Sequence, residues 1–461
     1  MTIISVAMSI VVIAAALLAV YRAHRSSAFG LGAILAVFVI EIVVEGIPPV
    51  NVGVNIFAQD VVAVVLVAAS VLRILANTRN ISGLASIFWL MFGVLIAFSL
   101  LRGFGPYGTN AVVESRPHWY YWSAALYFMT FRPTSANLRR LCLVWILVGG
   151  VLGLLVLFRW VSDALGLSDY SAVGAGIPLR VVNAQTACFI AFSAISALYL
   201  YIKRPKNWLI LLSVGLFFIV VVLQHRSAWT ATMAGLSVLL LLERKHLSGM
   251  TSLGAGAILV VSGLIAVTLF STQWGGSAVQ GISNSFSSAT DLSGGTGYDR
   301  LVIWQTMTTR WAESGISTWL FGFPYGIDYV LYILDPRGHL LDVTFSAHNF
   351  YVQLLYNTGA AGIAFASGAW VTTVGKLFVR VRQLGTRYQG QGYDSLLLVL
   401  VAASLVFFLT YQGSDFHGII LGTAIATTKP SVKRAFFRTV RLAGTRLGQW
   451  HRKENLPTIS G

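Results

Sequence analysis

Three arginines and one histidine stand at the edges of apolar segments, and their types suit chemistry on a phosphate-bearing substrate. Arg226 lies in a short turn between two apolar runs, Arg180 precedes another run, and Arg300 follows a glycine-rich stretch. A guanidinium group binds phosphate oxygens in a bidentate manner, which lysine does not match. His348 precedes a further apolar run, where a helix N-terminus favours the neutral imidazole. A neutral imidazole can accept a proton from a hydroxyl group. The four residues together therefore indicate a phosphate-binding site beside a general base.

An amphipathic helix is predicted around Arg300. Trp304, Met307 and Trp311 fall on one face at helical spacing, and this face is expected to anchor the helix on a membrane surface. Arg300 is expected in the first turn of this helix. A cation there opposes the helix dipole, but it reinforces an anion site at the helix N-terminus.

The same residues have structural alternatives. Arg226 could be an interfacial arginine that reaches lipid headgroups, and Arg180 with Asn183 could mark the boundary of a span. His348 could be an interfacial or core histidine, with Asn349 orienting either its ring or a substrate. Residue types alone leave both interpretations open.

The composition decides what kind of element positions these residues. Of the 461 residues, 56% are hydrophobic and only 10% are charged, whereas a soluble domain carries roughly 25% charged residues. The formal net charge of +16 fits basic cytoplasmic loops better than a nucleic-acid partner. Cys142 and Cys188 lie in apolar runs and are predicted to be small core residues, and no Cys/His spacing resembles a zinc site. The chain is therefore predicted to be an all-α polytopic membrane protein.

The apolar runs predict twelve or thirteen transmembrane helices. A span needs about 20 apolar residues. Thirteen runs approach that length, near residues 2–20, 28–47, 56–76, 84–101, 118–131, 141–158, 183–202, 207–223, 227–242, 252–270, 347–371, 394–411 and 418–436. They divide the chain into a first transmembrane bundle (1–270), a long loop with the amphipathic helix (271–346), C-terminal transmembrane helices (347–436) and a basic tail (437–461).

The distribution of basic residues predicts the orientation. One set of alternating loops carries sixteen Lys and Arg residues, and the other set carries eight, all arginines. The richer set should face the cytoplasm, which puts the long loop, Arg180, Arg226 and Arg300 on the outer side. Glu41 and Glu45 lie toward the outer end of one helix, where pairing with arginine is expected in preference to a proton path.

The ordered motifs resemble the bacterial O-antigen ligase and O-antigen polymerase superfamily over about residues 180–425. The matching features are His225-Arg226-Ser227-Ala228-Trp229, the glycine-rich lead into Arg300 with Trp304 four residues on, Phe321-Gly322, and Ala347-His348-Asn349-Phe350-Tyr351 followed by Gly359 and Gly362. One departure from the family pattern concerns residues 323–325, where a second glycine often follows Gly322 and none is present.

The resemblance implies transfer of a glycan from an undecaprenyl-diphosphate carrier at the periplasmic face of the bacterial inner membrane. Ligases pass the glycan to lipid A-core, and polymerases pass it to another carrier-linked repeat unit. Carried over, Arg226 and Arg300 would hold the diphosphate, Arg180 would be a third ligand, and His348 would be the base. Asn349, Trp304 and Asn183 would support them. Neither a metal nor another cofactor is implied, and direct attack by the acceptor would invert the anomeric centre.

Two other functions compete with this one. A transporter or flippase of lipid-linked sugars would show broken helices and repeated halves, and neither is evident in the sequence. A non-catalytic scaffold of an envelope complex is the third possibility. The partners predicted for the enzyme are the lipid-linked donor, a glycan acceptor and membrane lipids, without nucleic acid.

Overall fold

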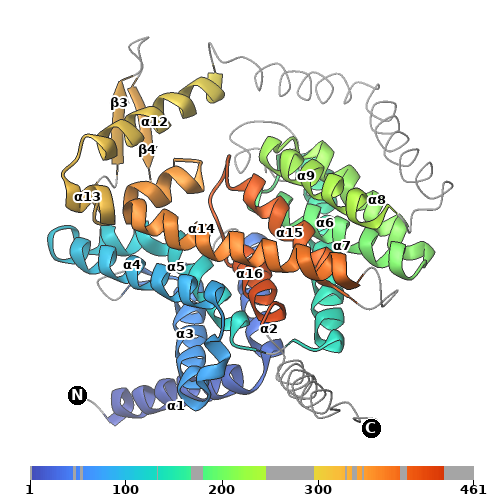
Figure 1. Cartoon of the computed structure of the whole chain (residues 1–461), viewed down its shortest axis with the longest axis horizontal. Helices are drawn as coiled ribbons and strands as arrows, with labels where there is room; N and C mark the ends of the chain where they lie inside the picture. The colour runs from blue at the N-terminus through green and yellow to red at the C-terminus, as the bar shows by residue number, and fades with distance from the viewer. Residues whose placement is uncertain are drawn as a thin grey trace, which may run out of the picture.

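The structure is a computed structural model that describes residues 3–44, 48–51, 55–131, 133–167, 180–244, 295–327, 330–334, 340–344, 347–384 and 392–429. Helices dominate it, as the sequence predicted (Figure 1). The first group is α1 (Ile3–Arg25), α2 (Ser27–Val43), α3 (Ala58–Ala76), α4 (Leu84–Tyr107), α5 (Thr109–Met129), α6 (Ser135–Ala164), α7 (Ala184–Lys203), α8 (Asn207–Val222) and α9 (Arg226–Glu243). The second group is α12 (Gly295–Ala312), α13 (Ile316–Phe321), α14 (Phe350–Leu384), α15 (Asp394–Phe407) and α16 (Asp415–Thr427).

The polytopic membrane fold is confirmed by the length and composition of these helices. Among the described residues, α3, α4, α6, α7 and α14 are long and apolar enough to cross a membrane, and α2, α8 and α15 are shorter apolar helices. Leucines on the outside are left uncovered by protein, with Leu147 and Leu154 exposed by 66% and 67%. Each predicted span corresponds to one helix, except the run at 252–270, which lies outside the described residues together with the tail at 437–461.

Polar contacts join loops that the charge count assigned to the same side. On the predicted cytoplasmic side, Arg73 Nε donates to the His24 carbonyl at 2.9 Å, and Lys429 Nζ donates to the Met129 carbonyl at 2.6 Å. On the other side, Arg159 Nη1 donates to the Val181 carbonyl at 2.7 Å. Each of these three contacts joins residues that the charge count placed on the same side.

Helix α14 is broken near its start by a glycine. Gly359 has φ of 66° and ψ of −168°, a conformation that residues with a Cβ rarely adopt. A Cβ on Gly359 would lie 2.4 Å from the Leu320 carbonyl oxygen, and a Cβ on Gly322 would lie 2.4 Å from the Asn357 backbone. The two glycines therefore let the end of α13 lie directly against the break in α14.

The loop after Gly322 lacks the additional glycine of the family pattern and is anchored by buried polar contacts. Tyr325 is fully buried, and its hydroxyl forms a hydrogen bond of 3.0 Å with His118 Nδ1. Glu114 accepts hydrogen bonds from the Gly326 amide and, at 2.7 Å, from Asn357 Nδ2. The carboxylate of α5 thus connects this loop to α14 and holds the first turns of α14 in place.

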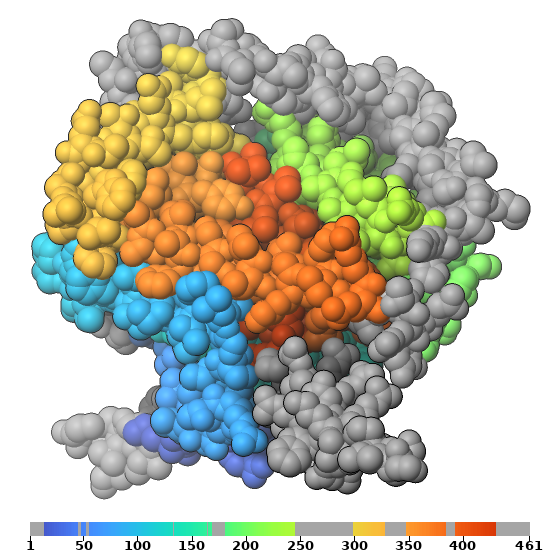
Figure 2. All heavy atoms as spheres, in the orientation of Figure 1, coloured from blue at the N-terminus to red at the C-terminus, as the bar shows by residue number. Residues whose placement is uncertain are grey.

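A β-hairpin lies between α13 and α14, and it was not predicted. Strands β3 (Val330–Leu334) and β4 (Leu340–Thr344) pair in antiparallel register, and a smaller pair, β1 (Val50–Asn51) and β2 (Asn55–Ile56), precedes α3. In Figure 1, α12, α13 and the hairpin lie together above the start of α14. Figure 2 shows the yellow surface of α12 and α13 adjoining the orange surface of α14, with the red-orange α15 between α14 and the green α9.

Candidate active site

Arg180, Arg226 and Arg300 come from distant parts of the sequence and gather in one place. Arg180 precedes α7, Arg226 is the first residue of α9, and Arg300 lies on α12. Burial lowers the pKa of Arg180, and the charges of Arg226 and Arg300 lower it further. Burial likewise lowers the pKa of Arg300, with a further contribution from Arg226. Because like charges repel in a partly buried place, this cluster favours an anion that carries more than one negative charge.

Two hydrogen bonds tie the segment of Arg180 to the turn that carries Arg226. Arg180 Nη2 donates to the Gln224 carbonyl at 2.9 Å, and His225 Nε2 donates to the Val182 carbonyl at 2.7 Å. Gln224 has a positive φ of 56°, so the turn between α8 and α9 is tight. The segment of Arg180 and the turn that carries Arg226 are therefore held together through backbone carbonyls.

His225 positions the turn that carries Arg226. The sequence motif included His225, but no role was predicted for it. Burial lowers its pKa to about 4, and the nearby Arg180 lowers it as well, while its hydrogen bond to Val182 acts in the opposite direction. The ring is therefore neutral at pH 7 and donates from Nε2 without adding a fourth positive charge to the cluster.

Arg300 does not stand in the first turn of its helix, so that prediction is wrong. Helix α12 begins at Gly295, and the glycine-rich lead is its first turn. The helix includes Gly295 and Gly297 despite their weak helix propensity. The helix dipole therefore gives no reason for an anion site at Arg300. Attraction for an anion would come from the neighbouring guanidinium groups instead.

The apolar face of α12 packs on protein, where the sequence predicted a membrane anchor. Met307 is buried in a cluster with Ile303, Ala347 and Tyr356. Trp304 packs beside this cluster, and its Nε1 donates to the Ala347 carbonyl at 2.7 Å. Since Ala347 directly precedes His348, this bond links the helix that carries Arg300 to the candidate base.

His348 lies just before α14, as predicted, in the left-handed region with φ of 47°. Its half-buried ring packs against Tyr411 with a centroid separation of 5.7 Å. Burial lowers the pKa of His348 to about 4, and the positive charge of Arg300 contributes to that shift. The imidazole is therefore neutral at pH 7, and it lies close enough to Arg300 for that charge to influence its pKa.

The two asparagines are helix caps. Asn349 Oδ1 accepts hydrogen bonds from the amides of Tyr351 and Val352 at 3.0 and 3.1 Å. Asn183 Oδ1 accepts from the Thr186 amide at 2.9 Å. Each side chain fixes the start of the helix that follows a candidate site residue, α14 after His348 and α7 after Arg180, so their support is given through the backbone.

Tyr411 is a site residue that sequence reasoning missed. It follows α15, packs on His348 and lies within the electric field of Arg300. Burial raises the pKa of Tyr411, and Arg300 opposes that rise. Its sequence context, Phe407-Phe408-Leu409-Thr410-Tyr411, reads as the end of a span, so no local signal distinguishes it.

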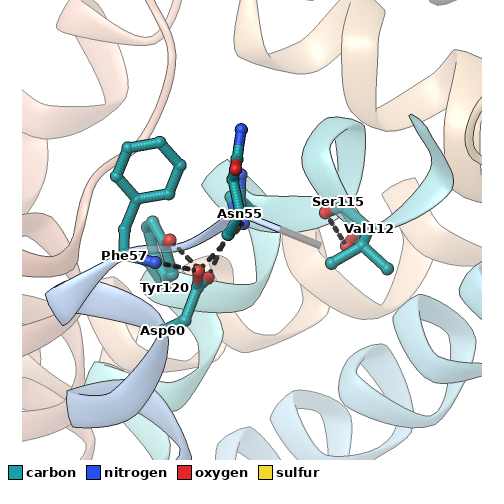
Figure 3. Close-up of polar contacts among 7 residues, drawn as sticks. Asn55, Phe57, Asp60, Val112, Ser115 and Tyr120 are labelled. Carbon is teal, nitrogen blue, oxygen red and sulfur yellow. Dashed lines mark hydrogen bonds and ion pairs between the residues drawn. The ribbon is translucent and has the colours of Figure 1, made fainter. Parts of the chain in front are cut away.

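Arg116 lies on the same predicted side, but it pairs with a carboxylate. Its Nε and Nη2 donate to the two carboxylate oxygens of Asp60 at 3.1 and 2.9 Å. Asp60 also accepts from the Tyr120 hydroxyl at 2.6 Å and from the Phe57 amide at 2.9 Å, and Figure 3 shows both groups meeting at its carboxylate. The carboxylate is saturated by these contacts, so Arg116 serves to join α3 to α5.

The remaining described arginines of this side contact backbone carbonyls or aromatic rings. Arg337 lies outside the described residues. The contacts are Arg159 with the carbonyls of Val181 and Ile42, Arg102 with the carbonyl of Gly322, and Arg310 with the ring of Phe323. Arg180, Arg226 and Arg300 differ from these arginines in that their charges act on one another.

A cavity of about 360 Å³ lies at the start of α7, and its lining includes neither the three arginines of the cluster nor His348. Its lining includes Asn183 and Gln412, the neighbours of the Arg180 segment and of Tyr411, and extends to Glu41 and Asp415. Glu41 accepts a hydrogen bond from Gln59 Nε2, and not from an arginine as predicted. Glu45 lies outside the described residues. The volume and polar lining suit a small polar group such as a sugar.

The fold and this site define a class: a polytopic helical membrane protein with a cationic cluster and a neutral imidazole together at one end of its helices. Residues 211–367 match the model of the O-antigen ligase family, described as O-Antigen ligase. Over these residues the match confirms the resemblance drawn from the motifs. It includes Arg226, Arg300 and His348 and leaves Arg180 outside. No curated protein matches the chain. The family supports glycan transfer of the ligase or polymerase kind in general.

Proposed function

We propose that this protein transfers a glycan from an undecaprenyl-diphosphate carrier to an acceptor hydroxyl at the periplasmic face of a bacterial inner membrane. The observation that carries the proposal is the gathering of Arg180, Arg226 and Arg300 beside a neutral His348. A diphosphate supplies the several negative charges that such a cluster favours. The apolar surface of the surrounding helices suits the long prenyl chain, and the family match supports a lipid-linked glycan as the substrate.

In the proposed reaction the acceptor oxygen attacks the anomeric carbon of the donor sugar. The new carbon–oxygen bond forms as the bond from that carbon to the diphosphate oxygen breaks, and the diphosphate leaves with the electron pair. Arg226 and Arg300, with Arg180 as a third group, stabilise the charge that develops on the leaving oxygen. Direct displacement of this kind inverts the anomeric centre, and it needs no metal ion because the guanidinium groups provide the positive charge.

His348 takes the proton of the acceptor hydroxyl in this scheme. Its pKa of about 4 keeps the ring neutral, and therefore able to accept, throughout the physiological range. At this pKa His348 is a weaker base than an ordinary histidine. Proton transfer therefore has to occur late, when the attacking oxygen has already become acidic. The cavity at the start of α7, lined by Asn183 and Gln412, is the proposed place for a sugar.

Reconstituted transfer tests the function. Purified protein in sealed liposomes is incubated with a carrier-linked glycan and either lipid A-core or a second carrier-linked glycan. We expect one of the two acceptors to be elongated, with release of undecaprenyl diphosphate. A lipid A-core product identifies a ligase and a longer carrier-linked product identifies a polymerase. Failure with both acceptors, while carrier-linked glycan moves across the bilayer, would favour the transporter.

The pH dependence follows from the low pKa of His348. We expect kcat/KM to stay level from neutral pH down to about pH 5 and to fall only near pH 4, where His348 gains a proton. Replacing Arg300 by glutamine removes one of the two causes of the shift, so the acid limb of the residual activity should move to higher pH. An acid limb near 6.5 in the wild type, the value of an ordinary histidine, would contradict this assignment.

A further inference from the structure

A basic pocket and an apolar groove meet between α6 and α8, at the end of the helices away from the candidate active site. Helix α7 begins beside Arg180 and ends at Lys203, and α15 begins at the pocket and ends near Tyr411. Since α7 has 20 residues at about 1.5 Å each, roughly 30 Å separates the two places. The pocket therefore belongs to a different site from the arginine cluster.

The groove is entirely apolar. It has a volume of about 660 Å³ and is lined by residues of α6 and α8 only, among them Leu147, Leu154 and Leu211. Glycines on both helices keep it open, because a Cβ on Gly215 would meet nothing within 4 Å and one on Gly150 would meet only Leu212, at 3.9 Å. Leu211 is 72% exposed, so the groove faces the surroundings of the helices, which in a membrane are lipid.

The pocket at the end of the groove is basic. It has a volume of about 280 Å³, and its lining includes Arg139, Lys203, Arg204 and Lys206. Lys203 pairs with Glu243 at 2.6 Å. Within the described part of the chain, no carboxylate forms an ion pair with the other three groups.

The two hollows are continuous, because Leu143 and Trp208 line both of them. Trp208 is half exposed at the junction, where an indole suits the boundary between headgroups and acyl chains. Tyr393 lines the same pocket, and the charges of both Arg139 and Arg204 act on its phenol. A ligand that fills both hollows needs a compact anionic head and a long apolar chain.

We propose that this site binds an anionic phospholipid, with its phosphate in the basic pocket and an acyl chain in the groove. The pocket lies at the end that the charge distribution assigns to the cytoplasm, where the leaflet carries anionic lipids. A polyprenyl phosphate also combines a phosphate head with an apolar chain. The phospholipid of the bilayer, however, is present in large excess and meets the open groove directly. The proposal does not depend on the proposed glycan transfer.

Native mass spectrometry of the full-length protein in detergent tests the site. Phosphatidylglycerol should be retained and phosphatidylcholine should not. Arg139→Gln with Arg204→Gln should weaken phosphatidylglycerol binding about thirtyfold, because each basic group contributes separately. The matched control is Arg22→Gln with Arg25→Gln, which removes the same charge on the same predicted side, from α1.

A second variant tests the groove without touching charge. Gly215→Leu puts a side chain into open space, so it should fold normally and weaken phosphatidylglycerol binding at least about tenfold. Gly32→Leu on α2 is the control, because a Cβ there also meets nothing within 4 Å. Equal retention of the two phospholipids, or unchanged binding in the double arginine variant, would overturn the site. Displacement of phosphatidylglycerol by a lower concentration of polyprenyl phosphate would overturn the assignment of the occupant.

Discussion

Replacing His348 by asparagine should lower the rate of glycan transfer by about 10³-fold while leaving carrier binding nearly unchanged. His348 has a φ of 47°, and asparagine tolerates this left-handed conformation better than alanine does. The variant therefore removes the proton acceptor without adding backbone strain before α14. Turnover is measured with purified carrier-linked glycan and its acceptor, and carrier binding is measured with the same donor in the absence of acceptor.

The comparison with His348→Ala separates catalysis from folding. Alanine loses the base and also strains the turn, so it should show the same loss of turnover together with a lower unfolding midpoint. Asparagine should keep the wild-type midpoint. If His348→Asn retained more than about a tenth of the wild-type turnover, the imidazole would not be the proton acceptor, and its contact with Tyr411 would have to be explained by packing.

Hydropathy predicted where helices exist better than where they end. The fourth and fifth runs were predicted at 84–101 and 118–131, whereas α4 continues to Tyr107 and α5 begins at Thr109. The polar residues that interrupt the apolar pattern are buried against partners from other helices. Glu114 binds the Gly326 amide and Asn357, and Arg116 binds Asp60. A hydropathy window covers one segment and cannot detect such partners. It therefore predicts that the helix ends too early.

The site was predictable to the extent that charge stands out in an apolar chain. Arg226, Arg300 and His348 were selected by type and position, and the structure brings them together with Arg180. Arg116 and Arg159 have the same sequence signal, yet their guanidinium groups are engaged by Asp60 and by backbone carbonyls. The difference arises from helix packing, which also explains why the contact of Tyr411 with His348 was missed.

The break in α14 had a visible signal that was not interpreted. Gly359 and Gly322 were both noted as motif residues, but only the fold shows that their backbones touch. A glycine inside a helix costs about 1 kcal/mol relative to alanine, which packing can offset, so its presence does not by itself predict a break. The requirement comes from close approach of a second backbone, which is a tertiary property.

Conservative changes in the arginine cluster should be costly. Arg226→Lys and Arg300→Lys keep the charge but lose the planar pair of donors that a phosphate accepts from one guanidinium group. A hydrogen bond to a charged group contributes about 1.5–3 kcal/mol, so each variant should lose roughly 10- to 100-fold in kcat/KM, and the double variant should lose more. The loss should appear in the interaction with the donor, which is measured from the KM for carrier-linked glycan and from inhibition by prenyl diphosphate.

Arg310→Lys is the matched control, because Arg310 lies on α12 with Arg300 but stands over the ring of Phe323. It should leave kcat/KM within about twofold of the wild type, since an exposed cation–π contact contributes only about 0.5–1 kcal/mol to stability and none to substrate binding. The bidentate argument requires the two positions to differ. If lysine serves as well as arginine at 226 and 300, the cluster acts as a diffuse positive field, and any polyanion of similar size should then inhibit as strongly as a prenyl diphosphate.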